Sequence, residues 1–157
     1  MEIERKFIVT SDAYRRMASA SHHIAQGYLS RDPDRTVRVR VRDSEGFLTV
    51  KGRTRGFSRE EFEYAVGEAD ARQMLALCLP VVVEKTRWIV DYAGLRWEVD
   101  EFHGSLQGLV VAEVELESED QPVELPPFVG REVSDDPAYF NSSLSIHGMP
   151  ADTPNTN

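Results

Sequence analysis

The sequence predicts a mainly β protein in which eight antiparallel strands close into a barrel with a charged interior and a few short flanking helices. The first observation behind this is alternation. Glu2, Glu4 and Lys6 share one face of an extended opening strand, because successive side chains of a strand point to opposite faces. Ile3 and Phe7 occupy the other face, which is therefore apolar.

The second observation is that charge is sorted between strands. Residues 37–42 read Val-Arg-Val-Arg-Val-Arg, so one face of this strand is wholly basic, while residues 113–117 present a wholly acidic face. A half-buried strand with a solvated outer face explains each segment taken alone. Like charges directly opposite one another are destabilising, so a solvated sheet would gain from mixing the signs. The sorting favours a binding surface.

We therefore expect the charged face to line the barrel, since closure also removes exposed strand edges. Burying unpaired ions costs several kcal/mol each, so the interior must contain water, ions or substrate. The apolar outer face then needs cover from helices or from a partner subunit, which leaves a homodimer open. Trp88 and Trp97 are expected to pack under helices, and Tyr28 is assigned to the core.

The remaining elements follow from apolar periodicity and from turn residues. Seven further strands are expected at about residues 26–29, 36–42, 47–52, 59–66, 81–92, 95–102 and 109–118. Helices are expected at 13–20, 68–78 and 137–145. Ser11 or Asp12 can cap the first of these helices. Gly46 suits one hairpin turn, and Ala93-Gly94 suits another.

Composition excludes several classes of protein. The 157 residues fit one domain, expected at 1–148 with a frayed tail at 149–157. A net charge of -9 argues against a general nucleic-acid binder, whose affinity comes from neutralising phosphates. Cys78 is the single cysteine, which excludes an internal disulfide. Neither a transmembrane run nor a signal peptide is found, so a cytoplasmic protein without a membrane partner is expected.

The charged residues themselves predict the chemistry. Guanidinium and ammonium groups on the basic strands suit phosphate oxygens. Clustered carboxylates without a matching set of His or Cys suit hard cations such as Mg²⁺ or Mn²⁺. Phosphate binding together with metal-binding carboxylates indicates phosphoryl transfer.

The opening Glu2-x-Glu4-x-Lys6 resembles the ExExK signature of the CYTH superfamily, the triphosphate tunnel metalloenzymes. Further segments resemble the family over about residues 1–145 and occur in its order. They are Gln26-Gly27-Tyr28-Leu29, Arg38-Val39-Arg40, Lys51-Gly52, Arg59-x-Glu61-x-Glu63-Tyr64, Glu84-Lys85-x-Arg87 and Glu113-x-Glu115.

The resemblance implies an eight-stranded tunnel that binds a triphosphate-containing small molecule and a divalent metal. By this resemblance, one metal is held by Glu2, Glu4 and Glu113, and a second, water-activating metal by Glu115 with Glu63 or Asp100. Phosphate would be bound by Lys6, Arg38, Arg40, Lys51, Lys85 and Arg87. Lys85 or Arg59 would help to position the water.

Members of the family include inorganic triphosphatases, thiamine triphosphatases and class IV adenylate cyclases. No appended domain and no aromatic pocket for a base are expected, and in its length and opening the chain resembles the short bacterial members that are inorganic triphosphatases. This resemblance implies hydrolysis of inorganic triphosphate to pyrophosphate and phosphate. A sensor that binds polyphosphate or nucleotide without turnover is the non-enzymatic alternative. The complete acidic strand argues against it, because a pure anion binder has little use for Glu113 and Glu115.

Overall fold

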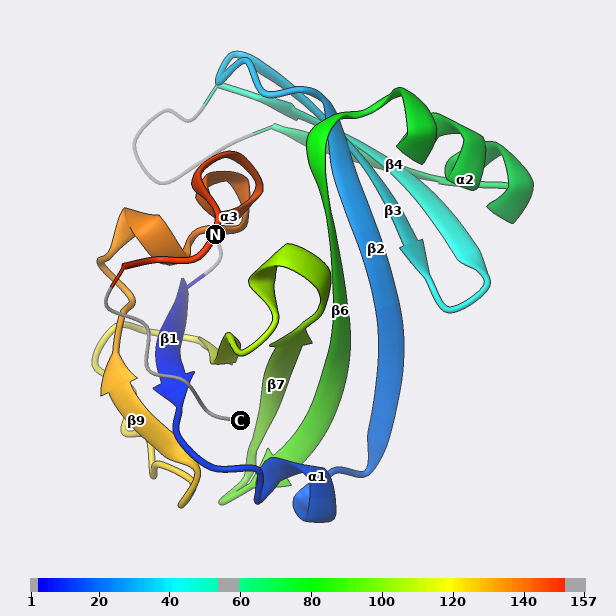
Figure 1. Ribbon diagram of the computed structural model, residues 1–157. Coiled ribbons are helices and arrows are strands. Elements are labelled where there is room, and N and C mark those ends of the chain that lie inside the picture. Colours follow the sequence, from blue (N-terminus) through cyan, green and yellow to red (C-terminus); the bar gives the residue numbers. More distant parts are fainter. Residues whose placement is uncertain (1–2, 54–59, 152–157) are drawn as a thin grey trace. The chain divides into compact units, whose positions relative to one another are not determined.

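The computed structural model describes residues 3–53 and 60–151, and it is mainly β with short helices (Figure 1). The strands are β1 (Ile3–Val9), β2 (Ala20–Ser30), β3 (Arg35–Arg42), β4 (Glu45–Gly52), β5 (Glu61–Val66), β6 (Leu79–Tyr92), β7 (Leu95–Phe102), β8 (Val110–Leu116) and β9 (Val129–Glu132). The α-helices are α1 (Tyr14–Met17), α2 (Glu68–Leu77) and α3 (Asn141–His147), and two 3₁₀ turns span Gly104–Leu106 and Pro137–Tyr139.

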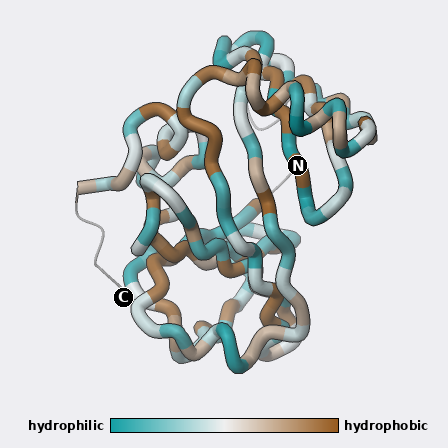
Figure 2. The backbone as a smooth tube through the Cα atoms, turned by 45° about the vertical axis from the view of Figure 1, so that its right-hand side comes forward, coloured by the Kyte–Doolittle hydropathy of each residue, from teal (hydrophilic) through white to brown (hydrophobic). Residues whose placement is uncertain are grey.

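The strands form one sheet in the order β5-β4-β3-β2-β6-β7-β8-β1-β9. The chain divides into two compact units. Among the described residues, the first unit contains residues 23–53 and 60–84, and the second contains residues 3–22 and 85–151. The two longest strands, β2 and β6, each run through both units. Short hydrophilic and hydrophobic stretches alternate along the backbone of the strands, as the alternating sequence requires (Figure 2).

In the first unit, α2 covers one face of the β3–β4 hairpin. Val39 and Val41 point toward this helix and are fully buried against Ala71. A side chain at Gly46 would come within 2.6 Å of the Ala71 side chain, so only glycine allows α2 to pack this closely. Gly46 was expected in the hairpin turn. The turn is instead made by Asp43, which has a φ of 54°, and by Ser44.

In the second unit, the core lies on the face of β1, β7 and β8 that is opposite to the charged one. Trp97 and Phe7 are fully buried in it, with ring centroids 5.6 Å apart. Tyr14 from α1 packs edge-on against Trp88 at 6.1 Å and against Phe128 at 6.0 Å. Trp88 therefore packs against α1 as expected, and Trp97 lies in the core against Phe7 of β1.

The predicted closed barrel is confirmed only as a mainly antiparallel β fold. The strand order ends at β5 and β9, and none of the described pairings closes the sheet. The described residues also hold nine strands rather than eight. The additional strand, β9, pairs antiparallel with β1 through Phe7–Glu132 and Val9–Val129. Its sequence, Val-Gly-Arg-Glu, has no alternation by which it could have been predicted.

The helices nearest the two ends of the chain are shorter than predicted. The first, α1, has four residues, and neither Ser11 nor Asp12 caps it. It ends because the chain joins the sheet: the Ser19 amide donates to the Ile89 carbonyl at 2.9 Å, and β2 begins at Ala20 rather than near residue 26. The expected helix at 137–145 is a 3₁₀ turn followed by α3, with extended backbone at Phe140 between them.

Two further expectations concern the chain ends and the membrane. Most of the tail expected to fray lies outside the described residues, which end at residue 151. None of the helices in the described segments is long and apolar enough to cross a membrane.

Candidate functional site

The first unit presents a charged sheet face opposite α2. The strand register sets Tyr28 beside Arg38, Arg38 beside Thr49, and Thr49 beside Glu63, so these four side chains form one row across β2, β3, β4 and β5. Directly paired residues project from the same side of a sheet. Tyr28 therefore shares the charged face with Arg38, and its side chain is buried there, as its assignment to the core implied.

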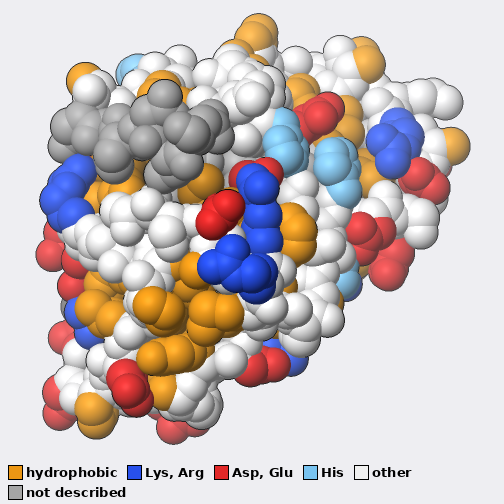
Figure 3. All heavy atoms as spheres, turned by 60° about the horizontal axis from the view of Figure 1, so that its bottom comes forward, with side chains coloured by type: hydrophobic (Ala, Val, Ile, Leu, Met, Phe, Trp, Pro, Cys, Tyr) orange, Lys and Arg blue, Asp and Glu red, His pale blue; other side chains and the backbone are white. Residues whose placement is uncertain are grey.

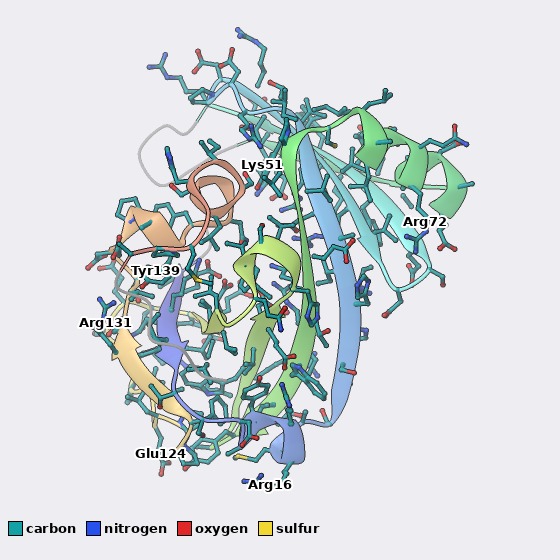
Figure 4. All side chains as sticks on the ribbon, in the orientation of Figure 1. Arg16, Lys51, Arg72, Glu124, Arg131 and Tyr139 are labelled. Atoms are coloured by element: carbon teal, nitrogen blue, oxygen red, sulfur yellow. The ribbon has the colours of Figure 1, made fainter. Side chains whose placement is uncertain are left out.

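This row places a cation, a hydroxyl and a carboxylate in contact. Thr49 donates to Glu63 at 2.8 Å, and the Arg38 guanidinium lies 3.6 Å from the same carboxylate. Arg38 is only 9% exposed. Lys51, labelled in Figure 4, lies on the next row, 3.9 Å from Glu61 of β5. Glu63, expected as a second-metal ligand, thus forms an ion pair with Arg38 and a hydrogen bond with Thr49.

A third row contains Arg40 and a side chain that the sequence analysis did not select. Gln26 of β2 is paired with Arg40 in the register, and Arg40 Nε donates to its carbonyl oxygen at 3.1 Å. Gln26 is 1% exposed. The signal by which the sequence could have identified Gln26 is a polar side chain at a strand position that the fold buries. Arg42, nearer the end of β3, pairs with Glu45 in the register and is exposed.

In the second unit, a buried ion network lies at the centre of the charged face. Asp100 accepts from Lys85 Nζ at 2.8 Å and from Arg87 Nε and Nη2 at 2.8 and 2.9 Å. Arg87 Nη1 also lies 3.1 Å from Glu98. Lys85 is 0% exposed and Asp100 is 1% exposed. Bidentate pairing of this kind is strong and fixes the plane of the guanidinium.

The network shifts the pKa of its members in different directions. Burial, reinforced by the neighbouring Arg87 charge, lowers the pKa of Lys85, although Asp100 opposes the shift. Burial alone would raise the pKa of Asp100, but Lys85 and Arg87 outweigh it and hold that pKa well below its usual range. Two cations share one carboxylate, so Lys85 is the member that is disposed to lose a proton.

The neighbouring strands β1 and β8 carry the clustered carboxylates. The register sets Glu4 directly beside Glu115, and Lys6 beside Glu113. Glu98 of β7 is paired with Glu113 on its other side. Lys6 Nζ lies 3.4 Å from Glu113 and donates to the backbone oxygen of Tyr139 at 3.2 Å, so the turn before α3 contacts this cation (Tyr139 is labelled in Figure 4).

The expected metal ligands are only partly brought together. Glu2 and Arg59 lie outside the described residues. Within residues 3–53 and 60–151, no three His, Cys, Asp or Glu side chains converge as a metal site. Asp100 is bonded to Lys85 and Arg87 instead. The register nevertheless sets Glu4 and Glu115 side by side, and such a pair is destabilised unless a cation lies nearby.

The opposite face of the second unit differs from this site in its charge pattern. Glu101 accepts from Tyr14 Oη at 2.8 Å and from Arg15 Nη2 at 3.0 Å. Burial, with this hydrogen bond to Glu101, raises the pKa of Tyr14 to about 12. In the view of Figure 3, cationic and anionic side chains lie next to one another on the surface.

The order of the charged residues along the chain can be compared with known families. A model described as the CYTH domain matches residues 1–144. The chain belongs to the CYTH domain family. This agrees with the resemblance of the ExExK opening and of the motifs that follow it, and those motifs supply both of the charged faces described above.

Two curated CYTH relatives are similar over nearly their whole length. An inorganic triphosphatase from Acetivibrio thermocellus is 47% identical over 144 residues, which cover 91% of this chain and 92% of that protein. An inorganic triphosphatase from Nitrosomonas europaea is 34% identical over 149 residues, or 92% of this chain and 97% of that protein.

Solved structures show the same CYTH fold. The crystal structure of the inorganic triphosphatase NE1496 has a TM-score of 0.72 and 31% identity, over 92% of this chain and 94% of that one. A protein from Hippeastrum, described as a putative adenylyl cyclase with a dominant triphosphatase activity, has a TM-score of 0.57 over 75% of this chain and 80% of that one. At 16% identity, this second likeness concerns the fold alone.

Proposed function

We propose that this protein hydrolyses inorganic triphosphate to pyrophosphate and phosphate with a divalent metal, Mg²⁺ or Mn²⁺. The observation that best supports this is a set of nearly buried cations, Lys6, Arg38 and Lys85, on sheet faces that also bear clustered carboxylates. A polyanion that brings metal ions satisfies both kinds of charge. The names of the two curated relatives point to the same substrate.

The proposed substrate enclosure is the closed eight-stranded tunnel that the family resemblance implies. The match of a single domain model to residues 1–144 supports one functional domain. We propose that phosphate is bound by Lys6, Arg38, Arg40, Lys51, Lys85 and Arg87. A homodimer remains an open alternative to a monomer.

The carboxylates fit a hard divalent cation. Glu4 and Glu115, paired in the register, together with Glu113 offer only oxygen ligands, which Mg²⁺ and Mn²⁺ prefer. We propose that these three residues hold the metal together with Glu2. When bound, a divalent cation would neutralise the triphosphate and polarise its phosphoryl oxygens. The second-metal role expected for Glu63 or Asp100 would require the ion pairs of these residues to open.

Lys85 is the proposed catalytic group. Burial lowers its pKa, so it loses a proton more readily than an ordinary lysine. We propose that Lys85 orients the attacking water and accepts its proton as the water oxygen bonds to the terminal phosphorus. The bridging P–O bond then breaks, and pyrophosphate leaves with the electron pair. Arg59 is the other residue proposed to position the water.

Metal removal tests the proposed function directly. With tripolyphosphate and Mg²⁺ or Mn²⁺, the protein should release phosphate and leave pyrophosphate as the accumulating product. Excess EDTA should abolish release, and added metal should restore it. The measurement is phosphate release, compared for tripolyphosphate, ATP and thiamine triphosphate as separate substrates. Undiminished turnover in EDTA would contradict the proposal, and cyclic AMP formation from ATP would indicate a cyclase instead.

The three arginines of β3 provide a graded test of phosphate binding. Arg38→Ala and Arg40→Ala should each weaken tripolyphosphate binding roughly 10- to 150-fold, because each removes a charge-assisted contact worth about 1.5–3 kcal/mol. Arg42→Ala is the matched control, since Arg42 is exposed and pairs with Glu45 in the register. Isothermal titration of the three variants measures the ranking. A loss confined to Arg42→Ala would mean that the basic face is misassigned.

A further inference from the structure

The side-chain amide of Gln26 has a buried nitrogen without a hydrogen-bond partner. Its oxygen accepts from Arg40 Nε at 3.1 Å, while its Nε2 has no partner among the described residues. The orientation of the amide is fixed chemically. An arginine Nε can only donate, so the carbonyl oxygen of Gln26 must face Arg40 and the NH₂ group must point elsewhere. With 1% exposure, bulk water does not solvate this donor.

A buried donor of this kind requires an explanation, because nearly all buried polar groups in folded proteins are hydrogen-bonded. Arg38, on the adjacent row of the same face, shows the same feature: its Nε is buried and also lacks a partner among the described residues. Gln26 pairs with Arg40 in the register, two residues along β3 from Arg38, so the two unpaired donors are diagonal neighbours. Diagonal neighbours in a sheet lie roughly 7–8 Å apart.

Glu63, the carboxylate that contacts Arg38 on this face, accepts from neither of these two unpaired donors among the described residues. Glu63 already accepts from Thr49 at 2.8 Å and lies 3.6 Å from Arg38 Nη2. What remains unsatisfied is a pair of donors, one cationic and one neutral. A ligand with several acceptor oxygens along a short chain would satisfy both, and a polyphosphate is such a ligand.

We propose that Gln26 is a substrate-binding residue, which donates its Nε2–H to a phosphoryl oxygen of the triphosphate while its carbonyl oxygen orients the Arg40 guanidinium. This inference rests on the proposed triphosphatase function and deepens it. The neutral amide fills a position where a further cation would repel Arg40. A phosphoryl oxygen of the bound triphosphate thereby accepts from Gln26 Nε2, which has no acceptor among the described residues.

Two substitutions separate the two roles of Gln26. Gln26→Met keeps the volume but removes both the donor and the acceptor, and Gln26→Glu keeps an oxygen for Arg40 but replaces the donor with a charged acceptor. Gln121→Glu is the control, because it adds the same charge in a loop where the Gln121 oxygen accepts only from the Glu117 amide among the described residues. We expect the KM for tripolyphosphate to rise at least about tenfold for both Gln26 variants and to stay unchanged for the control.

Thermal shift provides a readout that does not depend on turnover. Tripolyphosphate should raise the melting temperature of the wild type, and should raise that of Gln26→Met and Gln26→Glu less at the same concentration, since the stabilisation by a ligand grows with the logarithm of its concentration relative to Kd. Gln26→Met removes an unpaired buried donor but also the oxygen that accepts from Arg40 Nε, so the ligand-free melting temperature of each variant is the reference for its own shift.

Each other outcome overturns the inference. A defect in Gln26→Met alone would mean that Gln26 only orients Arg40. A defect in Gln26→Glu alone would mean that it lies near the substrate without donating to it. Wild-type behaviour of both variants would mean that the donor is satisfied by trapped water. If the wild type releases no phosphate, the proposed function fails, yet the thermal shift with tripolyphosphate still tests whether Gln26 binds it.

Discussion

Asp100→Asn should lower the free energy of unfolding by about 3–5 kcal/mol, the largest stability effect that we expect from a single substitution of this charged face. The variant leaves Lys85 and Arg87 buried without the carboxylate that both of them contact. Because the pKa of Asp100 is held low, its contribution is complete above the ordinary carboxyl pKa of about 3.9, and it is lost as the pH falls through the lower folded value. The deficit should therefore persist between about pH 5 and 7.

Asp91→Asn is the matched control, because Asp91 also pairs with an arginine, Arg96 at 3.7 Å, but both side chains are exposed. Its removal should cost less than about 1 kcal/mol. Urea unfolding of the three proteins at pH 7 measures the difference. An Asp100→Asn protein that is as stable as the wild type but inactive would refute this structural role and would favour the second-metal role expected from the family resemblance.

Glu115→Gln should reduce phosphate release at least about 100-fold, the largest effect on activity that we expect, because a metal ligand supplies several kcal/mol of transition-state stabilisation. Glu113→Gln should show a similar loss. Stability without metal should behave differently in the two variants. Glu115 is paired with Glu4, so its neutralisation relieves repulsion and should leave the melting temperature unchanged or higher. Glu113 lies 3.4 Å from Lys6, so Glu113→Gln should be slightly less stable.

Phosphate release and melting without metal should be measured together for both variants. Glu117→Gln is the control, because Glu117 follows β8 directly and is exposed. Wild-type turnover in Glu113→Gln and Glu115→Gln would refute the proposed metal site. Loss of activity in proteins that no longer fold would show only that these carboxylates are structural.

The sequence predicted those features that depend on alternation. The sharing of one face by Arg38 and Arg40, the placement of Trp97 in the core and the hairpin at Ala93-Gly94 all follow from the period-two geometry of strands and from local turn chemistry. The family was also predictable, because its motifs consist of the same alternating charges.

The features that the sequence missed depend on contacts between distant segments. The length of β2 is set by its partners, since Ser19 donates to Ile89, some seventy residues later. Gly46 serves the packing of α2 rather than a turn, which only the approach of Ala71 reveals. The role of Gln26 depends on which atoms surround its amide, and alternation carries no information about that.

The pairing of β1 has a consequence for synthesis of the chain. This strand is made first, yet its hydrogen-bonded neighbours are β8 and β9, and its ion pair from Arg5 to Glu132 spans 127 residues. At translation rates of about 5–20 residues per second, β1 must wait roughly 5–25 s before these partners emerge. An unpaired apolar strand invites aggregation, and charged residues are a common protection against it. Glu4, Arg5 and Lys6 would keep the nascent strand soluble, so the same charges that serve the site also protect the unfinished chain.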